Sequence, residues 1–261
     1  MATDQKTIDS YDRFAKGYHD HVSDPNDSIY HSYYEKPALR AELGDLTGKN
    51  ILCVGCGSGV DADWLAQNGS ASVTGVDISR ELIAIGRQQF PHLDLHVMDM
   101  EQLDLPDGAY DTACSSLAIH YVDNMTRSLK EVYRVLKPGG VYVFSCGHPL
   151  TSAMEISEDS TTTSKLLGTT TTKETEAQTV TGDYLAASTA GTRAIDGNLG
   201  DMDVRVYHRT FAVMVEQIVA SGFKIEKVVE PLPLESMRDI DPKTYETLMK
   251  LPAFIIWVVR K

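Results

Sequence analysis

The stretch of sequence that decides the fold is NILCVGCGSGVDADWLAQNGSASVTGVDIS, residues 50–79. It opens with an apolar run over 51–54, short enough for a buried strand, and a glycine-rich turn follows at 55–59. Apolar residues recur at helical spacing over 60–66, and a second apolar run at 73–76 predicts another strand. The order is therefore strand, glycine turn, helix and strand, which is typical of an α/β fold with a parallel sheet.

Asp77 ends the second apolar run and gives the stretch a chemical meaning. A glycine turn lets the backbone pass close to a ligand because no Cβ intervenes, and the helix behind it offers free N–H groups. A carboxylate at the end of the next strand, roughly 20 residues further on, can accept both hydroxyls of a ribose. We therefore expect a site for a nucleoside-containing cofactor.

The spacing of the glycines separates the possible cofactors. A dinucleotide fingerprint, G-x-G-x-x-G/A, needs a third small residue where Val60 stands. A P-loop needs Gly-Lys-Ser/Thr, which does not follow Gly59. A nicotinamide-dependent oxidoreductase stays an alternative, since it uses the same strand, glycine loop and Asp.

Several motifs resemble the class I S-adenosylmethionine (SAM) dependent methyltransferases. VGCGSG and VDIS resemble the first two motifs of that family, and RVLKPGG followed by VYVFS resembles its turn into the fifth strand. YDRFAKGYHDH resembles an N-terminal element that folds over the cofactor in small-molecule methyltransferases. GHP, YHRT and SGF…EPLP resemble a subgroup of uncharacterised bacterial methyltransferases, so the resemblance covers nearly the whole chain outside residues 151–206.

The resemblance implies a Rossmann-like, doubly wound α/β fold. Its sheet would have seven strands, mostly parallel, with an antiparallel C-terminal edge strand. We expect an N-terminal helical lid at 1–45, a SAM-binding core at 46–149, a Thr/Ser-rich cap insertion at 150–207, and the rest of the core at 208–261.

Within the insertion, alternation over Val204–Tyr207 predicts a strand, which we expect to pair with Tyr184–Ala187 in a small hairpin.

The resemblance also implies which residues hold SAM. The glycine loop would pack against the methionyl part, Asp77 would bind the ribose, and Asp99 would accept from the adenine amino group. Alternatively, the side chain of Asp99 caps a helix or a turn. The full cofactor-binding set is Tyr18, Gly55, Cys56, Gly57, Gly59, Asp77, Ile78, Asp99, Met100, Glu101, Ser116 and Leu117.

The candidate catalytic residues are His120, Tyr121, His148 and His208. They lie near predicted strand ends or at a junction with the cap, and histidine is the usual base near neutral pH. His120 leads, because the resemblance places its strand end nearest the transferred methyl group. Arg209 could hold a carboxylate on the acceptor, or it could form a salt bridge within the cap.

Composition narrows the partners. The net charge of −13 and the absence of a basic stripe argue against nucleic acid and an anionic membrane surface. The first residues show no signal peptide, and the longest apolar run, 253–259, is too short to span a bilayer. We expect a cytoplasmic monomer or homodimer. The four cysteines are expected to be structural, and no spacing predicts a metal site.

The leading prediction is a SAM-dependent methyltransferase that acts on a small molecule by in-line displacement and yields S-adenosyl-L-homocysteine (SAH). A non-catalytic module that binds SAM or SAH is a second alternative, and a protein acceptor docking on the insertion is a third. The acceptor and the atom that is methylated stay open.

Overall fold

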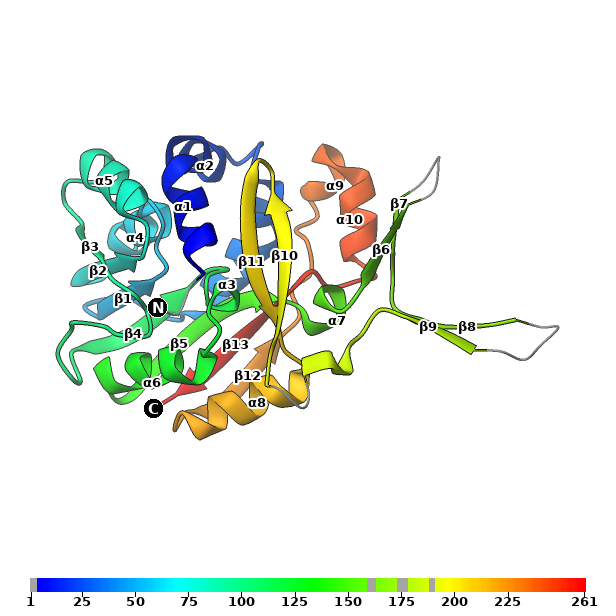
Figure 1. Cartoon of the computed structure of the whole chain (residues 1–261). Helices are drawn as coiled ribbons and strands as arrows, with labels where there is room; N and C mark the ends of the chain where they lie inside the picture. Colours follow the sequence, from blue (N-terminus) through cyan, green and yellow to red (C-terminus); the bar gives the residue numbers. More distant parts are fainter. Residues whose placement is uncertain (1–3, 159–162, 173–177, 188–190) are drawn as a thin grey trace.

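The computed structural model describes residues 4–158, 163–172, 178–187 and 191–261. Its centre is a seven-stranded sheet with the order β12-β13-β5-β4-β1-β2-β3 (Figure 1). The strands are β1 (Asn50–Val54), β2 (Ser72–Asp77), β3 (Asp94–Val97), β4 (Tyr110–Ser115), β5 (Leu136–Gly147), β12 (Lys224–Val229) and β13 (Phe254–Arg260).

The sheet is mostly parallel. β1 pairs in parallel with β2 and β4, and β4 pairs in parallel with β5. β13 runs antiparallel to both β5 and β12. The predicted fold class is thus confirmed, and the antiparallel C-terminal strand lies next to the edge strand β12 (Figure 1).

Helices cover both faces of the sheet because the central strands are apolar on both sides. On one face, Leu52 and Phe144 pack in a cluster that includes Leu129 and Ile218. These two come from helices α6 (Met125–Val135) and α8 (Phe211–Ala220).

On the other face, Ile51 and Val143 pack in a cluster with Leu39, Leu65 and Ile83. These last three come from helices α3 (Lys36–Glu42), α4 (Val60–Gln67) and α5 (Arg80–Gln89).

The N-terminal region is helical. It contains α1 (Gln5–Arg13), α2 (Ala15–Ser23) and a π-helix, η1 (His31–Glu35), which continues into α3. α1 and α2 both pack against α5. The short helices α9 (Met237–Ile240) and α10 (Pro242–Leu248) pack through Met237 and Tyr245 on Tyr34 of the π-helix.

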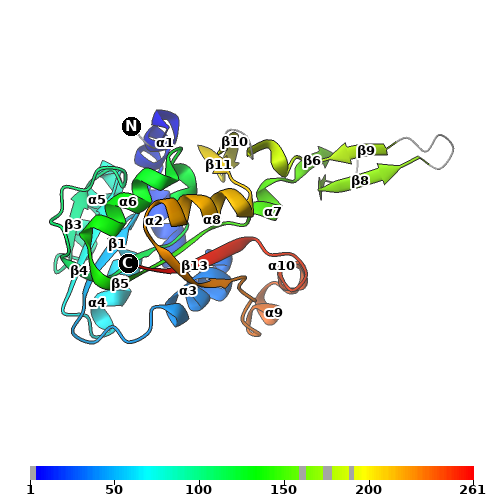
Figure 2. The same ribbon diagram turned by 90° about the horizontal axis from the view of Figure 1, so that it is seen from below.

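The described residues of the insertion between β5 and α8 form mainly short paired strands. Its elements are α7 (Pro149–Ser152), β6 (Glu155–Glu158), β7 (Thr163–Leu166), β8 (Gly168–Thr171), β9 (Gln178–Thr181), η3 (Leu185–Ala187), β10 (Arg193–Leu199) and β11 (Met202–His208). The β6–β7 and β8–β9 pairs project away from the body, whereas the β10–β11 hairpin lies against it (Figures 1 and 2).

The predicted partner of the strand over 204–207 is wrong. β11 pairs with β10, not with Tyr184–Ala187, which ends in the turn η3. Gly200 and Asp201 join the two strands as a two-residue turn, and Gly200 has a φ of +59°. A turn of this length pairs neighbouring segments directly, so the nearer partner forms the hairpin.

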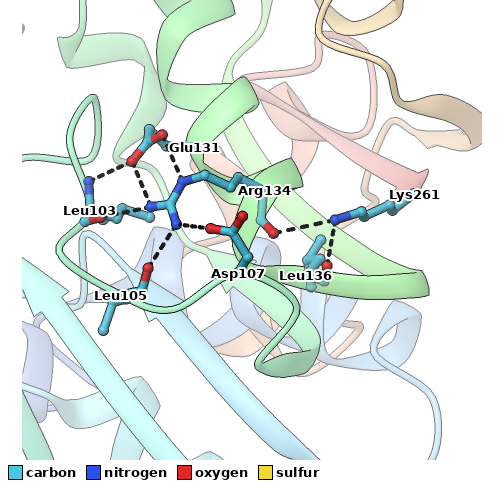
Figure 3. A network of polar contacts seen from close by, with 7 residues as sticks. All are labelled: Leu103, Leu105, Asp107, Glu131, Arg134, Leu136 and Lys261. Carbon is cyan, nitrogen blue, oxygen red and sulfur yellow. Dashed lines mark hydrogen bonds and ion pairs between the residues drawn. The ribbon is translucent and has the colours of Figure 1, made fainter.

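A polar network fixes the loop between β3 and β4 to α6 (Figure 3). Arg134 of α6 donates to the carbonyl oxygens of Leu103 and Leu105, each at 2.7 Å, and pairs with Asp107 and Glu131. Three donor bonds from this guanidinium hold the loop, while two more go to Glu131 of the same helix and orient the side chain of Arg134.

Among the described residues, no helix combines the length and the apolar content that a membrane crossing requires. The division into four parts, the cytoplasmic location and the oligomeric state stay predictions.

Candidate functional site

A cavity lies where β1, β2 and β4 end, on the side that α1 and α2 cover. It encloses about 670 Å³ of empty space, part of it open to solvent. Its lining is Thr7, Ile8, Tyr11, Tyr18, Gly55, Gly57, Val76, Asp77, Ile78, Leu82, Met98, Met100, Ser116, Leu117, Ala118 and Tyr121. We call it the first cavity.

The glycine loop forms one wall of the first cavity. Gly55 and Gly57 have φ values of +65° and +55°, which favour glycine. A Cβ on Gly55 would lie 2.3 Å from the Cβ of Ala118, and one on Gly57 would point toward the ring of Tyr18. The loop thus needs glycine both to turn and to leave space. Gly59, outside the lining, starts α4 with a φ of +88°.

Asp77 lies at the end of β2, beside the glycine loop. One carboxylate oxygen accepts a hydrogen bond from the N–H of Gly57 at 2.7 Å, and the other accepts from the N–H of Ser79 at 2.9 Å. Burial raises the pKa of this carboxyl above its ordinary value. Asp77 and Ile78 both line the cavity, as their predicted roles require.

The loop after β3 supplies a second wall. Met98 and Met100 line the first cavity, whereas Asp99 and Glu101 are outside its lining. Asp99 accepts from the N–H of Glu101 at 2.9 Å, which is the turn-capping geometry considered above. Glu101 is buried, and burial raises its pKa. The adenine-binding roles of Asp99 and Glu101 stay predictions.

The segment after β4 closes the third side. Ser116 and Leu117 line the cavity, and the N–H of Leu117 donates to Ser145 at 2.9 Å. Leu117 has a φ of +49°, a strained conformation that is rare outside glycine and frequent at functional sites. Ser145 of β5 therefore holds a strained backbone turn directly beside the ligand space.

Sequence reasoning missed Glu35, a fully buried carboxyl behind this wall. The hydroxyls of Ser116 and Ser145 donate to its two oxygens. Burial raises its pKa to about 7. The sequence around Glu35 shows only an acid next to Tyr34 in an aromatic helical run. The burial of Glu35 depends on β4 and β5, which are distant in the sequence.

A small hollow adjoins the glycine loop on its other side. Cys56 lines it, together with Lys36 and Asp61, which form an ion pair at 3.2 Å. The hollow shares Tyr18 and Ser116 with the first cavity. Cys56 thus lies next to the ligand space rather than in its wall.

Tyrosines gather over the first cavity. The hydroxyl of Tyr11 donates to that of Tyr121 at 2.9 Å, and the ring of Tyr11 packs edge-on against those of Tyr18 and Tyr121. Burial raises the pKa of all three phenols. They therefore stay neutral near pH 7 and present aromatic faces and hydroxyl groups, not phenolates.

Polar contacts tie the helices α1 and α2 to the core. Asp12 accepts hydrogen bonds from the Ser79 hydroxyl at 2.6 Å and from the N–H of Glu81. His19 of α2 contacts the hydroxyl of Ser58 at 2.7 Å. The hairpin adds a third tie, because the N–H of Arg205 donates to Thr7 at 2.8 Å.

A second cavity lies on the other side of the turn η2 (Ile119–Tyr121), and encloses about 580 Å³, part of it open to solvent. Ala118 and Tyr121 face the first cavity, whereas Ile119 and His120 face the second. The whole lining is Ile119, His120, Met125, Cys146, Gly147, Ser152, Val206, Tyr207, His208, Arg209 and Met214.

The three candidate histidines differ in their partners. His208 lines the second cavity, but its two nitrogens contact Ser152 at 2.7 Å and the Tyr184 carbonyl oxygen at 2.9 Å. His148 is outside both linings, since it caps α7 and pairs with Glu230 at 3.0 Å.

His120 differs from both. It lines the second cavity, and its Nδ1 is buried without a hydrogen-bond partner among the described residues. Burial lowers its pKa to about 4. His120 is thus the candidate histidine that lines a cavity and keeps a ring nitrogen without a partner among the described residues, and the catalytic roles of all four candidates stay predictions.

Within the described part of the chain, no three His, Cys, Asp or Glu side chains gather as metal ligands would. The four cysteines are buried, unpaired thiols.

The residues around the first cavity fit an adenosyl sulfonium cofactor. The glycine loop approaches Ala118 more closely than any residue with a Cβ could, and the partly buried carboxylate of Asp77 ends β2 beside it. The aromatic rings of Tyr11, Tyr18 and Tyr121 line the same cavity, where they can face a cation.

Comparisons with known proteins agree with this fit. A family model described as a methyltransferase domain matches residues 52–144. The crystal structure of a SAM-dependent methyltransferase from Mesorhizobium loti has a TM-score of 0.67 and 29% identity, covering 86% of this chain and 96% of that one.

Two curated relatives are also similar. An uncharacterized protein of Haemophilus influenzae is 28% identical over 206 residues, 76% of each chain. A malonyl-[acyl-carrier protein] O-methyltransferase of Pectobacterium atrosepticum is 36% identical over 99 residues, which cover 38% of this chain and 39% of that enzyme.

These matches set the nicotinamide-dependent alternative aside and identify SAM as the cofactor. The matched domain spans the glycine loop, Asp77 and the turn after β4. Residues 52–144 match a methyltransferase domain, and the sheet order around them is that of a class I S-adenosylmethionine-dependent methyltransferase.

Proposed function

We propose that this methyltransferase acts on a small-molecule acceptor by in-line displacement. The observation that carries the proposal is the pair of cavities on either side of residues 118–121. The first has the features of a cofactor site. The second presents His120 and Arg209 within an otherwise largely apolar wall, which suits a small organic molecule.

The residues of the first cavity bind and orient the cofactor. The Gly55–Gly57 backbone and Ser116 would hold its methionyl part, Asp77 its ribose, and Met98 and Met100 its adenine. When bound, SAM supplies a methyl group on a positively charged sulfur, so the protein's task is alignment and exclusion of water.

The tyrosine cluster, Tyr11, Tyr18 and Tyr121, serves both tasks. Aromatic faces stabilise a nearby cation, more so where water is excluded. Because burial raises the pKa of Tyr121, its hydroxyl acts as an orienting group rather than a base. Tyr11 belongs to α1, so this cluster is complete only while α1 is in place.

His120 would take up the proton that the acceptor loses. With a pKa lowered to about 4 by burial, its imidazole is neutral at pH 7 and keeps one nitrogen lone pair. The neighbouring Arg209 also lowers this pKa. A negative charge on a bound acceptor would raise it again, toward the range in which a base is effective.

The elements around the cavities support a small acceptor over a macromolecular one. α1 and α2 carry residues that line the first cavity, β11 carries residues that line the second, and the β10–β11 hairpin lies beside α1 (Figure 1). The net charge of −13 also disfavours nucleic acid, whose phosphates would be repelled.

Methyl transfer to fractionated cell extract tests the proposal. The full chain is incubated with methyl-labelled SAM and either the ultrafiltrate, which holds only small molecules, or the retained macromolecules. We expect labelled product in the ultrafiltrate. Label that enters only the retained protein or nucleic acid would overturn the small-molecule assignment.

His120→Ala adds a check on mechanism. We expect this variant to keep the SAH affinity of the wild type and to lose turnover, by about 100-fold for a positioned base. His148→Ala is the matched comparison, because His148 lies outside both linings. Loss of SAH binding in His120→Ala would contradict the assignment.

A further inference from the structure

Arg209 is a buried cation without an acidic partner. Its side chain is 4% exposed, and no carboxylate lies within ion-pair distance in the part of the chain that the structure describes. The carboxylate of Asp123 is exposed and forms no ion pair with Arg209, although its charge raises the pKa of the guanidinium. A buried charge without a counter-ion is costly, so its retention calls for an explanation.

Four of its five N–H groups already donate to neutral acceptors. Nη2 bonds to the carbonyl oxygens of Val122 and Asp123 at 2.6 and 2.7 Å. Nε bonds to Gln217 at 3.0 Å, and Nη1 bonds to the carbonyl oxygen of Tyr207 at 3.2 Å. One N–H on Nη1 is left, and Arg209 lines the second cavity.

His120 shares this wall. Neither of its ring nitrogens hydrogen-bonds to another described residue, and Nδ1 is buried. The neutral ring has one N–H to donate and one lone pair. Arg209 therefore offers one free donor beside the ring of His120, which has no partner among the described residues, while Met125 and Met214 make part of the remaining surface apolar.

We propose that the second cavity binds the methyl acceptor through a carboxylate that pairs with Arg209. The inference rests on the proposed function, because it names the acceptor class. A carboxylate suits the site because its single negative charge balances the guanidinium and one of its oxygens can accept the remaining N–H of Arg209. The apolar surface would take the body of the molecule.

A purely structural role for Arg209 explains its bonds but not its charge. Its bonds to Val122, Asp123 and Gln217 tie the start of α6 to α8. A neutral donor would make such ties without the cost of burying a charge. A structural role and a carboxylate-binding role of Arg209 predict different ligand preferences when a carboxylate of the protein itself is placed beside the guanidinium.

Gln217→Glu supplies that acid with almost no change of shape. Its oxygen already accepts from Nε of Arg209, so the new carboxylate would neutralise the guanidinium in place. If Arg209 awaits a carboxylate ligand, this variant removes the need for one. If Arg209 is structural only, ligand preference does not change.

The test is a calorimetric titration of the full chain saturated with SAH, so that the first cavity is filled. The probes are benzoate and hexanoate, each compared with its neutral amide. We expect the wild type to prefer the carboxylates by at least about tenfold, as for a hydrogen bond to a charged group. In Gln217→Glu that preference should vanish while SAH affinity persists.

Two further proteins complete the design. Gln88→Glu, at an exposed position of α5, adds the same charge elsewhere and should keep the preference. Arg209→Gln should lose it, and if this variant fails to fold, Gln217→Glu alone decides. Equal affinity for acid and amide in the wild type, or a preference that survives in Gln217→Glu, would overturn the inference.

The proposed function has a separate readout. If small molecules of the ultrafiltrate are methylated but carboxylates are not preferred, only the acceptor class is wrong. If carboxylates are preferred but methyl label enters macromolecules alone, the carboxylate site stands and the small-molecule assignment falls.

Discussion

At the scale of single residues, Asp77 joins the cofactor site to the sheet. It holds the N–H of Gly57 and that of Ser79, so it shapes the glycine loop as well as facing the ligand space. Both roles depend on its place at the end of β2, where strand and loop meet.

We predict that Asp77→Ala weakens SAH binding more than tenfold. The variant removes the carboxylate expected to bind the ribose and two hydrogen bonds that shape the loop, each worth about 1 kcal/mol or more. Calorimetry with SAH measures the change. Asp94→Ala is the control, because Asp94 is the first residue of the neighbouring strand β3, away from the end of the sheet that carries Asp77. An unchanged SAH affinity in Asp77→Ala would show that Asp77 does not bind the ribose.

Glu35 makes stability depend on pH. Its pKa in the folded chain is about 7, above the ordinary 4.5, so the folded state holds a proton that the unfolded state has lost. The stability that this group contributes is complete below about pH 4.5 and is lost as the pH rises through 7.

We predict that Glu35→Gln removes this loss. Between pH 5 and pH 8 the free energy of unfolding of the wild type should fall by up to about 3 kcal/mol relative to that of the variant. Its melting temperature should fall relative to that of the variant in the same range. Thermal melts across that range measure it. Glu81→Gln is the control, because it changes an exposed carboxyl and its melting temperature should differ from that of the wild type by the same amount at every pH. If the difference for Glu35→Gln also stays constant with pH, Glu35 is ionised throughout.

At the scale of elements, the sequence predicted the strands, turns and helix starts that depend on neighbouring residues. The strand, glycine turn, helix and strand of residues 50–77 follow from apolar periodicity and from glycine at positive φ. Ser79 and Asn124 cap α5 and α6, as their side chains allow.

Features that depend on distant contacts escaped prediction. Glu35 is buried because β4 and β5 bring Ser116 and Ser145 to it. His148 follows β5, but its side chain turns to the α7 backbone and to Glu230. The free nitrogen of His120 depends on how η2 packs between two cavities.

The helix α1 belongs to this scale as a cover of the first cavity. Asp12 ties it to the start of α5, so cofactor release should require these contacts to open. We predict that Asp12→Ala speeds SAH release several-fold, since two hydrogen bonds of about 1 kcal/mol each are lost.

Surface plasmon resonance gives the SAH release rate, and hydrogen exchange over residues 5–23 reports the loosening of α1 and α2. Asp9→Ala is the matched control, because Asp9 lies on the exposed side of the same helix. A release rate equal to that of the wild type would show that α1 does not retain the cofactor.

At the scale of the whole molecule, three parts of the chain meet at the ends of the sheet strands. The core supplies the glycine loop and Asp77, the N-terminal helices supply Tyr11 and Tyr18, and the insertion supplies the hairpin that contacts α1. The second cavity likewise joins core and insertion, through His120 and His208.

Calorimetric titration of the unmodified chain with SAH and NAD tests the central claim, that the first cavity binds an adenosyl sulfonium cofactor. We predict saturable SAH binding with one site per chain and no binding of NAD. Saturation by NAD, or the absence of SAH binding by a folded chain, would contradict the account.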